Sequence, residues 1–221
     1  MNICSGKKPA YTIPLPANLV CFLENRPAKR ILDVGCGYGR ACIFLRENGF
    51  DVVGVDVDST QVKLAIAETM SRGIRAGIDL SVNDAQYLCF QDYSFDAVTM
   101  LGILTLVPKG ERSRIMIEVE RVLKPSGYVF IEEFGRTWEN RVYRKRYRGD
   151  VGVTDELGTI TVKDENGRII HFGHHFARWE LCSLLKGFDI ISFEKGVFTS
   201  YYTSGNSTSS TRSHRRLTSS R

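Results

Sequence analysis

Residues 31–39 read ILDVGCGYG, and this short stretch decides the fold. An apolar run leads directly into Gly35, Gly37 and Gly39, and the segment 40–49 that follows has the apolar spacing of a helix. Glycine adopts positive φ and lets a ligand approach the backbone closely. The amides at a helix N-terminus attract carboxylate or phosphate groups. The pattern therefore predicts a strand, a tight turn and a helix, with a ligand at the carboxyl end of the strand.

The spacing of the glycines argues against a dinucleotide as that ligand. A dinucleotide fingerprint places its third glycine where Arg40 stands in this chain. Asp33 precedes the first glycine by two positions instead. A carboxylate beside a pyrophosphate is unfavourable, whereas a carboxylate beside an ammonium group is favourable. The turn is thus expected to receive a ligand that carries a positive charge.

Strand and helix patterns alternate on both sides of this stretch. The expected strands are 29–35, 50–58, 74–84, 94–104 and 128–134, and the expected helices are 40–49, 59–73 and 109–127. Asp58 or Ser59 can cap the second of these helices. Alternation of this kind is typical of right-handed βαβ units, which build a mostly parallel, doubly wound α/β sheet with helices on both faces.

The C-terminal third has a different pattern. A β-hairpin is expected over 158–172, with its turn at Asn166–Gly167, followed by a helix over 174–188. Two final strands, 188–196 and 197–204, are expected to meet in a tight turn at Gly196. Residues 203–221 hold seven Ser, four Thr and one large apolar residue, which predicts a disordered tail.

Charge is concentrated in two segments. The chain has 30 Lys and Arg against 25 Asp and Glu, a net charge of +5. The tail 203–221 carries +4 and residues 136–148 carry +5, which leaves −4 for the remainder. A basic balance throughout would suggest a nucleic-acid partner. Here the suggestion narrows to the basic segment 136–148, where recognition of an anionic group on the substrate is expected.

Composition excludes several classes of protein. Hydrophobic residues make up 43% and charged residues 25%, as in an ordinary globular domain. No apolar run is long enough for a membrane span, and no signal peptide is recognisable, so we expect no membrane partner and a cytoplasmic setting. The six cysteines are scattered without a C-x-x-C pair, which argues against a zinc ribbon or a thioredoxin motif.

Six segments in order along 15–202 resemble the class I S-adenosylmethionine-dependent methyltransferases of the broad small-molecule type. They are LDVGCGYG (32–39), the strand end VVGVD (52–56), NDA (83–85), FDAVTMLGIL (95–104), RVLKPSGYVFIEEF (121–134) and FARWELCSLLKGFDIISFE (176–194). The resemblance implies a Rossmann-like, mixed seven-stranded sheet with the last strand antiparallel. It divides the chain into an N-terminal arm and helix (1–28), a methyltransferase domain (29–202) with a hairpin and helix insert on the substrate side (136–175), and the tail.

The resemblance also implies the cofactor, S-adenosyl-L-methionine, and the residues that hold it. Asp56 resembles the acid that binds the ribose hydroxyls, and Asp84 the group that accepts from the adenine amine. Asp33 is either a direct ligand or an anchor of the loop. The full expected set is Asp33, Gly35, Cys36, Gly37, Gly39, Asp56, Val57, Asp84, Ala85 and Leu101.

Methyl transfer depends mainly on holding the acceptor in line with the methyl group, and a base is needed only where the acceptor loses a proton. Glu132 and Glu133 at a strand end and His171 in the hairpin are the candidate catalytic residues. His174 and His175 follow closely, but adjacent histidines without a neighbouring cysteine do not easily chelate one ion, so we expect no metal. The N/D-P-P-Y motif of amino-group nucleic-acid enzymes is absent after the fourth strand.

The basic segment offers three interpretations. On a helix, Arg141, Arg144 and Arg148 form one stripe, and Tyr143 and Tyr147 lie one turn apart. Such a helix can cover a small substrate with an anionic group, bind nucleic acid through phosphates and stacked bases, or be purely structural. Arg141, Arg144, Arg148 and Tyr143 are therefore candidate substrate-binding residues.

The sequence as a whole predicts a methyltransferase that acts on a small molecule. One alternative is an RNA methyltransferase that uses residues 136–148. The other is a non-catalytic module that binds S-adenosylmethionine for interaction with a partner.

Overall fold

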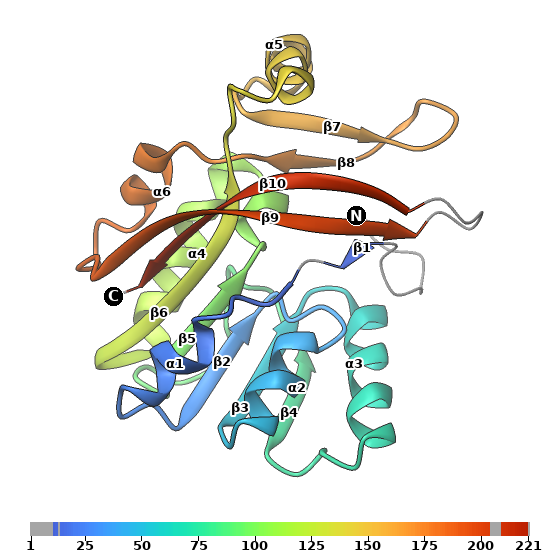
Figure 1. The fold of residues 1–221 in the computed structure, drawn as a ribbon. Coiled ribbons are helices and arrows are strands. Elements are labelled where there is room, and N and C mark those ends of the chain that lie inside the picture. Colours follow the sequence, from blue (N-terminus) through green and yellow to red (C-terminus); the bar gives the residue numbers. More distant parts are fainter. Residues whose placement is uncertain (1–10, 13, 204–208, 221) are drawn as a thin grey trace.

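The computed structural model describes residues 11–12, 14–203 and 209–220, and its middle layer is a twisted eight-stranded sheet (Figure 1). The order across the sheet is β1-β9-β10-β6-β5-β2-β3-β4. Its strands are β1 (Tyr11–Thr12), β2 (Arg30–Val34), β3 (Asp51–Asp56), β4 (Ile78–Val82), β5 (Phe95–Leu101), β6 (Leu123–Gly135), β9 (Ser192–Thr203) and β10 (Ser209–Ser220). The five strands from β6 to β4 pair in parallel. Strand β10 pairs antiparallel with both β6 and β9.

Helices cover both faces of this sheet. They are α1 (Leu19–Glu24), α2 (Arg40–Glu47), α3 (Ser59–Ser71), α4 (Lys109–Val122), α5 (Arg141–Thr154) and α6 (Arg178–Leu184), with a short 3-10 helix, η1 (Leu104–Leu106). Side chains from α1, α2 and α3 pack on one face against Ile31 and Val52, and those from α4 and α6 pack on the other against Leu32 and Val53. Neighbouring residues of a strand thus pack into cores on opposite faces of the sheet, because successive side chains of a strand alternate between faces.

The predicted Rossmann-like α/β class is confirmed, whereas the predicted count of seven strands is wrong. The sheet has eight strands, and only five of them form its parallel part. The turn expected at Gly196 is absent from the described chain, because β9 runs through that residue without a break. The antiparallel last strand is β10, which lies in the segment expected to be a disordered tail. A strand ladder is built from backbone groups, so a segment of Ser, Thr and Arg can form a strand between β6 and β9.

The boundary between α4 and β6 also differs from the expectation. The helix was predicted to run to residue 127, but α4 ends at Val122 and β6 begins at Leu123. Leu123 is already paired with Phe95 of β5, which draws the backbone into the sheet early. Of the two residues expected to cap α3, Asp58 is the cap, because its side chain accepts hydrogen bonds from the amides of Thr60 and Gln61.

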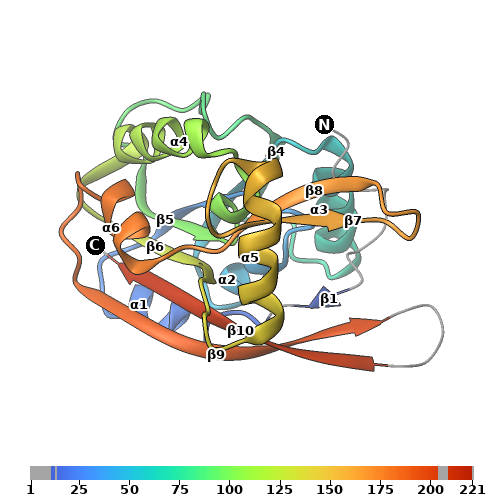
Figure 2. The ribbon, with the colours of Figure 1, turned by 90° about the horizontal axis from the view of Figure 1, so that it is seen from above.

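An insert between β6 and α6 stands above the carboxyl ends of the parallel strands. It holds α5 and a separate two-stranded sheet of β7 (Thr159–Lys163) and β8 (Ile169–His174), and Figure 2 shows it from above. The hairpin expected at Asn166–Gly167 is confirmed, with Gly167 at φ +78°. Helix α5 packs on the hairpin through a buried cluster of Tyr143, Tyr147 and Ile160.

Buried ion pairs tie this insert to the rest of the domain. The guanidinium of Arg112 on α4 donates to both carboxylate oxygens of Glu156, which follows α5, over 2.6 and 2.9 Å. Arg136 donates to Glu180 of α6 at 2.7 Å, and the His174 ring lies between the two carboxylates. The pair with Arg112 is almost free of solvent, because the side chains are 5% and 11% exposed.

We expect Arg112→Ala to destabilise the protein by about 3–5 kcal/mol, because it removes the guanidinium group from the buried Glu156 carboxylate. The measurement is urea unfolding followed by circular dichroism. Arg114→Ala is the matched control on the same helix, because the Arg114 side chain is 47% exposed and its loss should cost at most about 1 kcal/mol. Equal losses in the two variants would contradict the importance of the Arg112 pair.

Candidate functional site

The turn after β2 forms a cradle of three glycines in the left-handed region. Gly35, Gly37 and Gly39 have φ of +74°, +53° and +82°. A Cβ on Gly35 would lie 2.9 Å from Ile103, and one on Gly39 would lie 2.9 Å from Ala65, so both are packed against the domain. A Cβ on Gly37 would meet nothing within 4 Å. The cradle is thus closed by packing on two sides and open at Gly37.

Asp56 at the end of β3 holds the cradle in place. Its Oδ2 accepts from the Gly37 amide at 2.8 Å, and its Oδ1 accepts from the Asp58 amide at 2.9 Å. Burial raises the pKa of this carboxyl above its ordinary value, although the two amide donors oppose the rise. Each carboxylate oxygen retains acceptor capacity, which suits a diol. Next to it, the Val57 side chain is 65% exposed and offers an apolar surface.

Asp33 lies beneath the cradle and faces the interior. The residue is 2% exposed. Its Oδ1 accepts from the Thr99 hydroxyl at 2.8 Å, and its Oδ2 accepts from the Cys42 thiol at 3.3 Å. Burial raises the pKa of Asp33 to about 6. Of the two roles expected for Asp33, this geometry favours the anchor of the loop over a direct ligand.

The segment after β4 forms the far end of the site. The Asn83 amide donates to the Asp56 carbonyl at 3.0 Å, so this segment is joined to the end of β3. Asp84 is exposed, and its Oδ1 accepts from the Gln86 amide at 2.8 Å. Asn83 Oδ1 is buried and has no hydrogen-bond partner within the described residues. Sequence reasoning missed Asn83 as a polar group of the site, although it stands beside Asp84 in the NDA motif.

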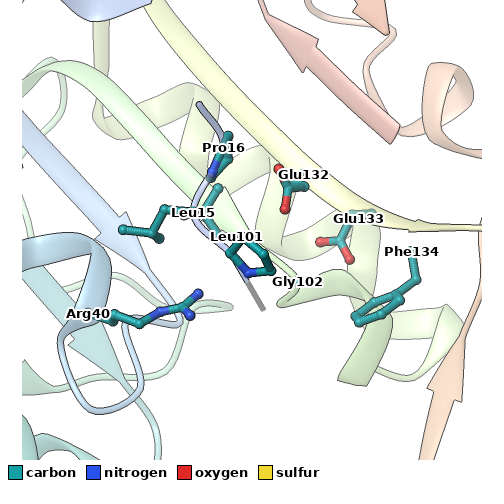
Figure 3. Close-up of a pocket in the computed structure, with 9 residues that line it drawn as sticks. Leu15, Pro16, Arg40, Leu101, Gly102, Glu132, Glu133 and Phe134 are labelled. Atoms are coloured by element: carbon teal, nitrogen blue, oxygen red, sulfur yellow. The ribbon is translucent and has the colours of Figure 1, made fainter. Parts of the chain in front are cut away.

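A cavity opens beside the cradle, at the carboxyl ends of β5 and β6 (Figure 3). Four segments build it, namely the N-terminal arm, the first turn of α2, the end of β5 and the end of β6. It is lined by Pro14, Leu15, Pro16, Arg40, Leu101, Gly102, Glu132, Glu133 and Phe134. Figure 3 shows the two glutamates and Phe134 on one side, opposite Leu15 and Arg40. The arm residues, Arg40 and Phe134 were not predicted as site residues. The arm residues and Arg40 lie in no quoted motif, and Phe134 ends the motif 121–134 without an assigned role.

The two glutamates differ in what they bind. Glu133 is 2% exposed, and it accepts from the Leu104 amide at 2.8 Å, the Thr105 amide at 3.0 Å and the Thr105 hydroxyl at 2.8 Å. Burial raises the pKa of Glu133 to about 8 against the effect of these donors. Glu133 thereby holds η1 over the end of β5. Glu132 is also buried, and its backbone carbonyl accepts from the Gly102 amide at 2.7 Å.

Behind Phe134, an aromatic cluster joins the cavity wall to α5. The Phe134 and His175 rings stack with centroids 5.6 Å apart, and His175 Nδ1 lies 2.7 Å from the Tyr147 hydroxyl. Burial raises the pKa of Tyr147 to about 12. Tyr143 is 6% exposed, and its ring lies 4.9 Å from that of His175. Tyr143, a candidate substrate contact, therefore packs within the cluster and does not line the cavity.

Other candidates lie away from the cavity. Arg141, Arg144 and Arg148 are exposed on α5 and are not part of the lining. His171 on β8 is half-buried, with Nδ1 at 3.3 Å from the Phe172 carbonyl, and it is not part of the lining either. The described part of the chain contains no group of three or more side chains suited to hold a metal ion.

Over the residues that the structure describes, no helix is both long and apolar enough to cross a bilayer.

Comparison with known proteins gives consistent findings. Residues 32–131 match the model of the family described as "Methyltransferase domain". A solved S-adenosylmethionine-dependent methyltransferase from Methanosarcina mazei is 33% identical, with a TM-score of 0.82 over 95% of this chain and 99% of that one. Methyltransferase GfsG of Streptomyces halstedii is 32% identical over 50% of this chain and 40% of its own length. A ubiquinone/menaquinone C-methyltransferase of Pseudomonas putida is 34% identical over 55% and 48%. The chain thus spans less than half the length of these two curated relatives.

We expect the stability of the protein to fall as pH rises from about 6 to 8, by at most about 1.4 kcal/mol per pH unit. The reason is that the folded pKa of Glu133, about 8, lies above its ordinary value of 4.5, so the folded state binds a proton that the unfolded state releases. Urea midpoints at pH 6, 7 and 8 measure this slope.

The Glu133→Gln variant should lose this decline, because it cannot ionise at this position. Glu165→Gln, which removes an exposed carboxylate in the β7–β8 turn, is the control and should keep the slope of the unmodified protein. The same slope in Glu133→Gln and in the unmodified protein would show that Glu133 does not titrate in this range.

Proposed function

This chain belongs to the S-adenosylmethionine-dependent methyltransferases, and we propose that it transfers a methyl group to a small-molecule acceptor held in the cavity at the ends of β5 and β6. The observation that carries the proposal is the junction of that cavity with the glycine cradle. Leu101 and Arg40 line the cavity, and Arg40 opens the helix that follows Gly39. A ligand in the cradle and an acceptor in the cavity would therefore be neighbours.

The cradle fits S-adenosylmethionine in three respects. Gly37 leaves open space where any other residue would place a Cβ, Asp56 offers carboxylate oxygens for ribose hydroxyls, and Asn83 Oδ1 is a buried acceptor without a partner in the described chain. When bound, this cofactor supplies a methyl group on a positively charged sulfur. The residues proposed to hold it are Gly35, Cys36, Gly37, Gly39, Asp56, Val57, Asn83, Asp84, Ala85 and Leu101, with Asp33 as the positioning residue below.

The cavity suits a compact acceptor with an apolar body. Pro14, Leu15, Pro16, Leu101 and Phe134 supply apolar walls. Contact with these walls would orient the acceptor, and orientation of this kind supplies much of the acceleration in a transfer between two bound groups. Within the described lining, Arg40 is the only cation. It is therefore the residue proposed to bind a carboxylate, whether that of S-adenosylmethionine or one on the acceptor.

Proton transfer, where the acceptor requires it, is assigned to Glu132. Both glutamates line the cavity, but the oxygens of Glu133 already accept three hydrogen bonds from Leu104 and Thr105. Glu133 is therefore proposed to position η1, and Glu132 to accept the proton. His171 lies outside the lining and is not given this role.

The experiment that tests the function is a turnover screen. Purified protein is incubated with S-adenosylmethionine and panels of small amines, phenols, thiols and carboxylates, and release of S-adenosylhomocysteine is measured. Turnover of a compound that is small enough for the cavity supports the proposal. Cofactor binding without turnover of any compound would favour the non-catalytic binding module.

We expect Gly37→Ala to lower the affinity for S-adenosylmethionine at least tenfold, because the new methyl group would fill the open side of the cradle. Gly73→Ala is a matched control, since Gly73 also has positive φ, +67°, and no atom within 4 Å of its Cβ position, but lies at the end of α3. Both variants should lose about 1–2 kcal/mol of stability from left-handed strain. Calorimetric titration distinguishes them, and an equal loss of affinity in both would remove Gly37 from the site.

We expect Asp56→Ala to lower the affinity for S-adenosylmethionine at least tenfold, through loss of both the ribose acceptor and the bond that fixes the Gly37 amide. Asp51→Ala at the opposite end of β3 is the control, because the Asp51 side chain is 70% exposed there. Unchanged calorimetric affinity in Asp56→Ala would show that the ribose assignment is wrong.

A further inference from the structure

The outward face of α5 is a strongly positive surface. Arg141, Arg144, Lys145 and Arg148 are all exposed, and together they line a shallow groove. Their spacing of three, four and seven residues places them on one side of the helix, over a length of about 10 Å. Figure 2, which looks down on α5 from above, shows that this helix lies on the outside of the insert.

Nothing in the described chain neutralises these four charges. None of them forms an ion pair with a described acidic side chain. The only acid within α5 before its C-terminus is Asp150, and it faces the hairpin, where it accepts from the Thr161 amide at 2.8 Å and the Thr161 hydroxyl at 3.1 Å. Four cations in this proximity repel one another, so the surface gains from any ligand that brings negative charge.

The opposite side of α5 fixes the direction in which the cations point. Tyr143 and Tyr147 are 6% and 0% exposed and pack with Ile160 of the hairpin. Arg146, which lies towards that side, donates to the Thr161 carbonyl. Rotation of the helix to bring its cations to the cavity would expose both tyrosines. The basic face therefore serves a partner outside the molecule, and the tyrosines are not available to stack on bases.

The chemistry of the face favours a run of phosphate groups. Three of the four cations are arginines, whose planar guanidinium groups bind phosphate oxygens in pairs. Gly149 and Gly152 are exposed on α5, and a Cβ at either would meet nothing within 4 Å, so a bulky backbone can approach closely. No apolar side chain stands between the cations to insert into a bilayer, although the exposed Val142, Val151 and Val153 flank them.

We propose that the outward face of α5 is a docking surface for the phosphate backbone of a nucleic acid. Binding is independent of base sequence, because the aromatic residues of α5 are buried and only the cations are presented. It falls with rising salt, because each neutralised phosphate releases counterions. The inference does not rest on the methyl acceptor, and its test is a binding measurement that needs no turnover.

The test is fluorescence anisotropy of a labelled 20-nucleotide oligouridine RNA with the full chain at 50–200 mM salt. The variant Arg144→Glu/Arg148→Glu should bind at least tenfold more weakly than the unmodified protein at 50 mM salt. Its slope of log affinity against log salt should be shallower by about 1.4, the value for two lost contacts to a single strand.

Lys63→Glu/Lys186→Glu is the matched control. Both lysines are exposed and lie on other surfaces, and their substitution changes the net charge by the same amount. It should keep the affinity for the RNA, and all proteins should keep their affinity for S-adenosylmethionine, which shows that they are folded. Equal weakening in both double variants, or no RNA binding at 50 mM salt, would overturn the proposal. Binding to vesicles with 30% phosphatidylserine, without binding to RNA, would overturn it in favour of a lipid surface.

Discussion

One hydrogen bond sets the geometry on which the site depends, namely the bond from the Gly37 amide to the Asp56 carboxylate at 2.8 Å. It joins the turn after β2 to the end of β3. The Val55 carbonyl adds two further bonds, from the amides of Gly35 and Cys36 at 2.8 and 2.9 Å. These contacts require β2 and β3 to be parallel neighbours that end at the same level, as their register from Arg30–Asp51 to Val34–Val55 provides. The parallel sheet is therefore what brings a glycine turn and an acid 19 positions later to one point.

Two other carboxylates support the site from inside the domain. Asp33 lies under the cradle, and Glu133 lies under η1, and burial raises the pKa of both. Burial disfavours the charged form of a carboxyl, so each of these groups has a local stability cost at neutral pH. Each carboxyl fixes a loop at the mouth of the cavity. Short hydrogen bonds from Thr99 to Asp33 and from Thr105 to Glu133 leave these loops little conformational freedom. Rigid support of this kind is what a reaction governed by positioning requires.

The sequence predicted those parts of the structure that depend on local pattern. The glycine turn, the alternation of strands and helices and the β7–β8 hairpin follow from neighbouring residues, and the structure contains them. It did not predict parts that depend on contacts between distant segments. Strand β10 owes its place to the backbone of β6 and β9, and Pro14–Pro16 reach the cavity only because the arm crosses the ends of β5 and β6. Arg40 and Phe134 were missed for the same reason, since the residues next to them in sequence do not show which distant segments lie beside them in the fold.

The insert shows why a correct helical pattern can still leave a role undetermined. The stripe of Arg141, Arg144 and Arg148 was expected, but a stripe alone does not say which side of the helix faces the protein. Tyr143 and Tyr147 decide it, because burying two aromatic rings against the hairpin and His175 is far more favourable than burying unpaired guanidinium groups. Once the rings are inside, the cations must point outward. The cavity is then left with Arg40 as its only described cation, and the basic face of α5 shares no described lining residue with the cavity.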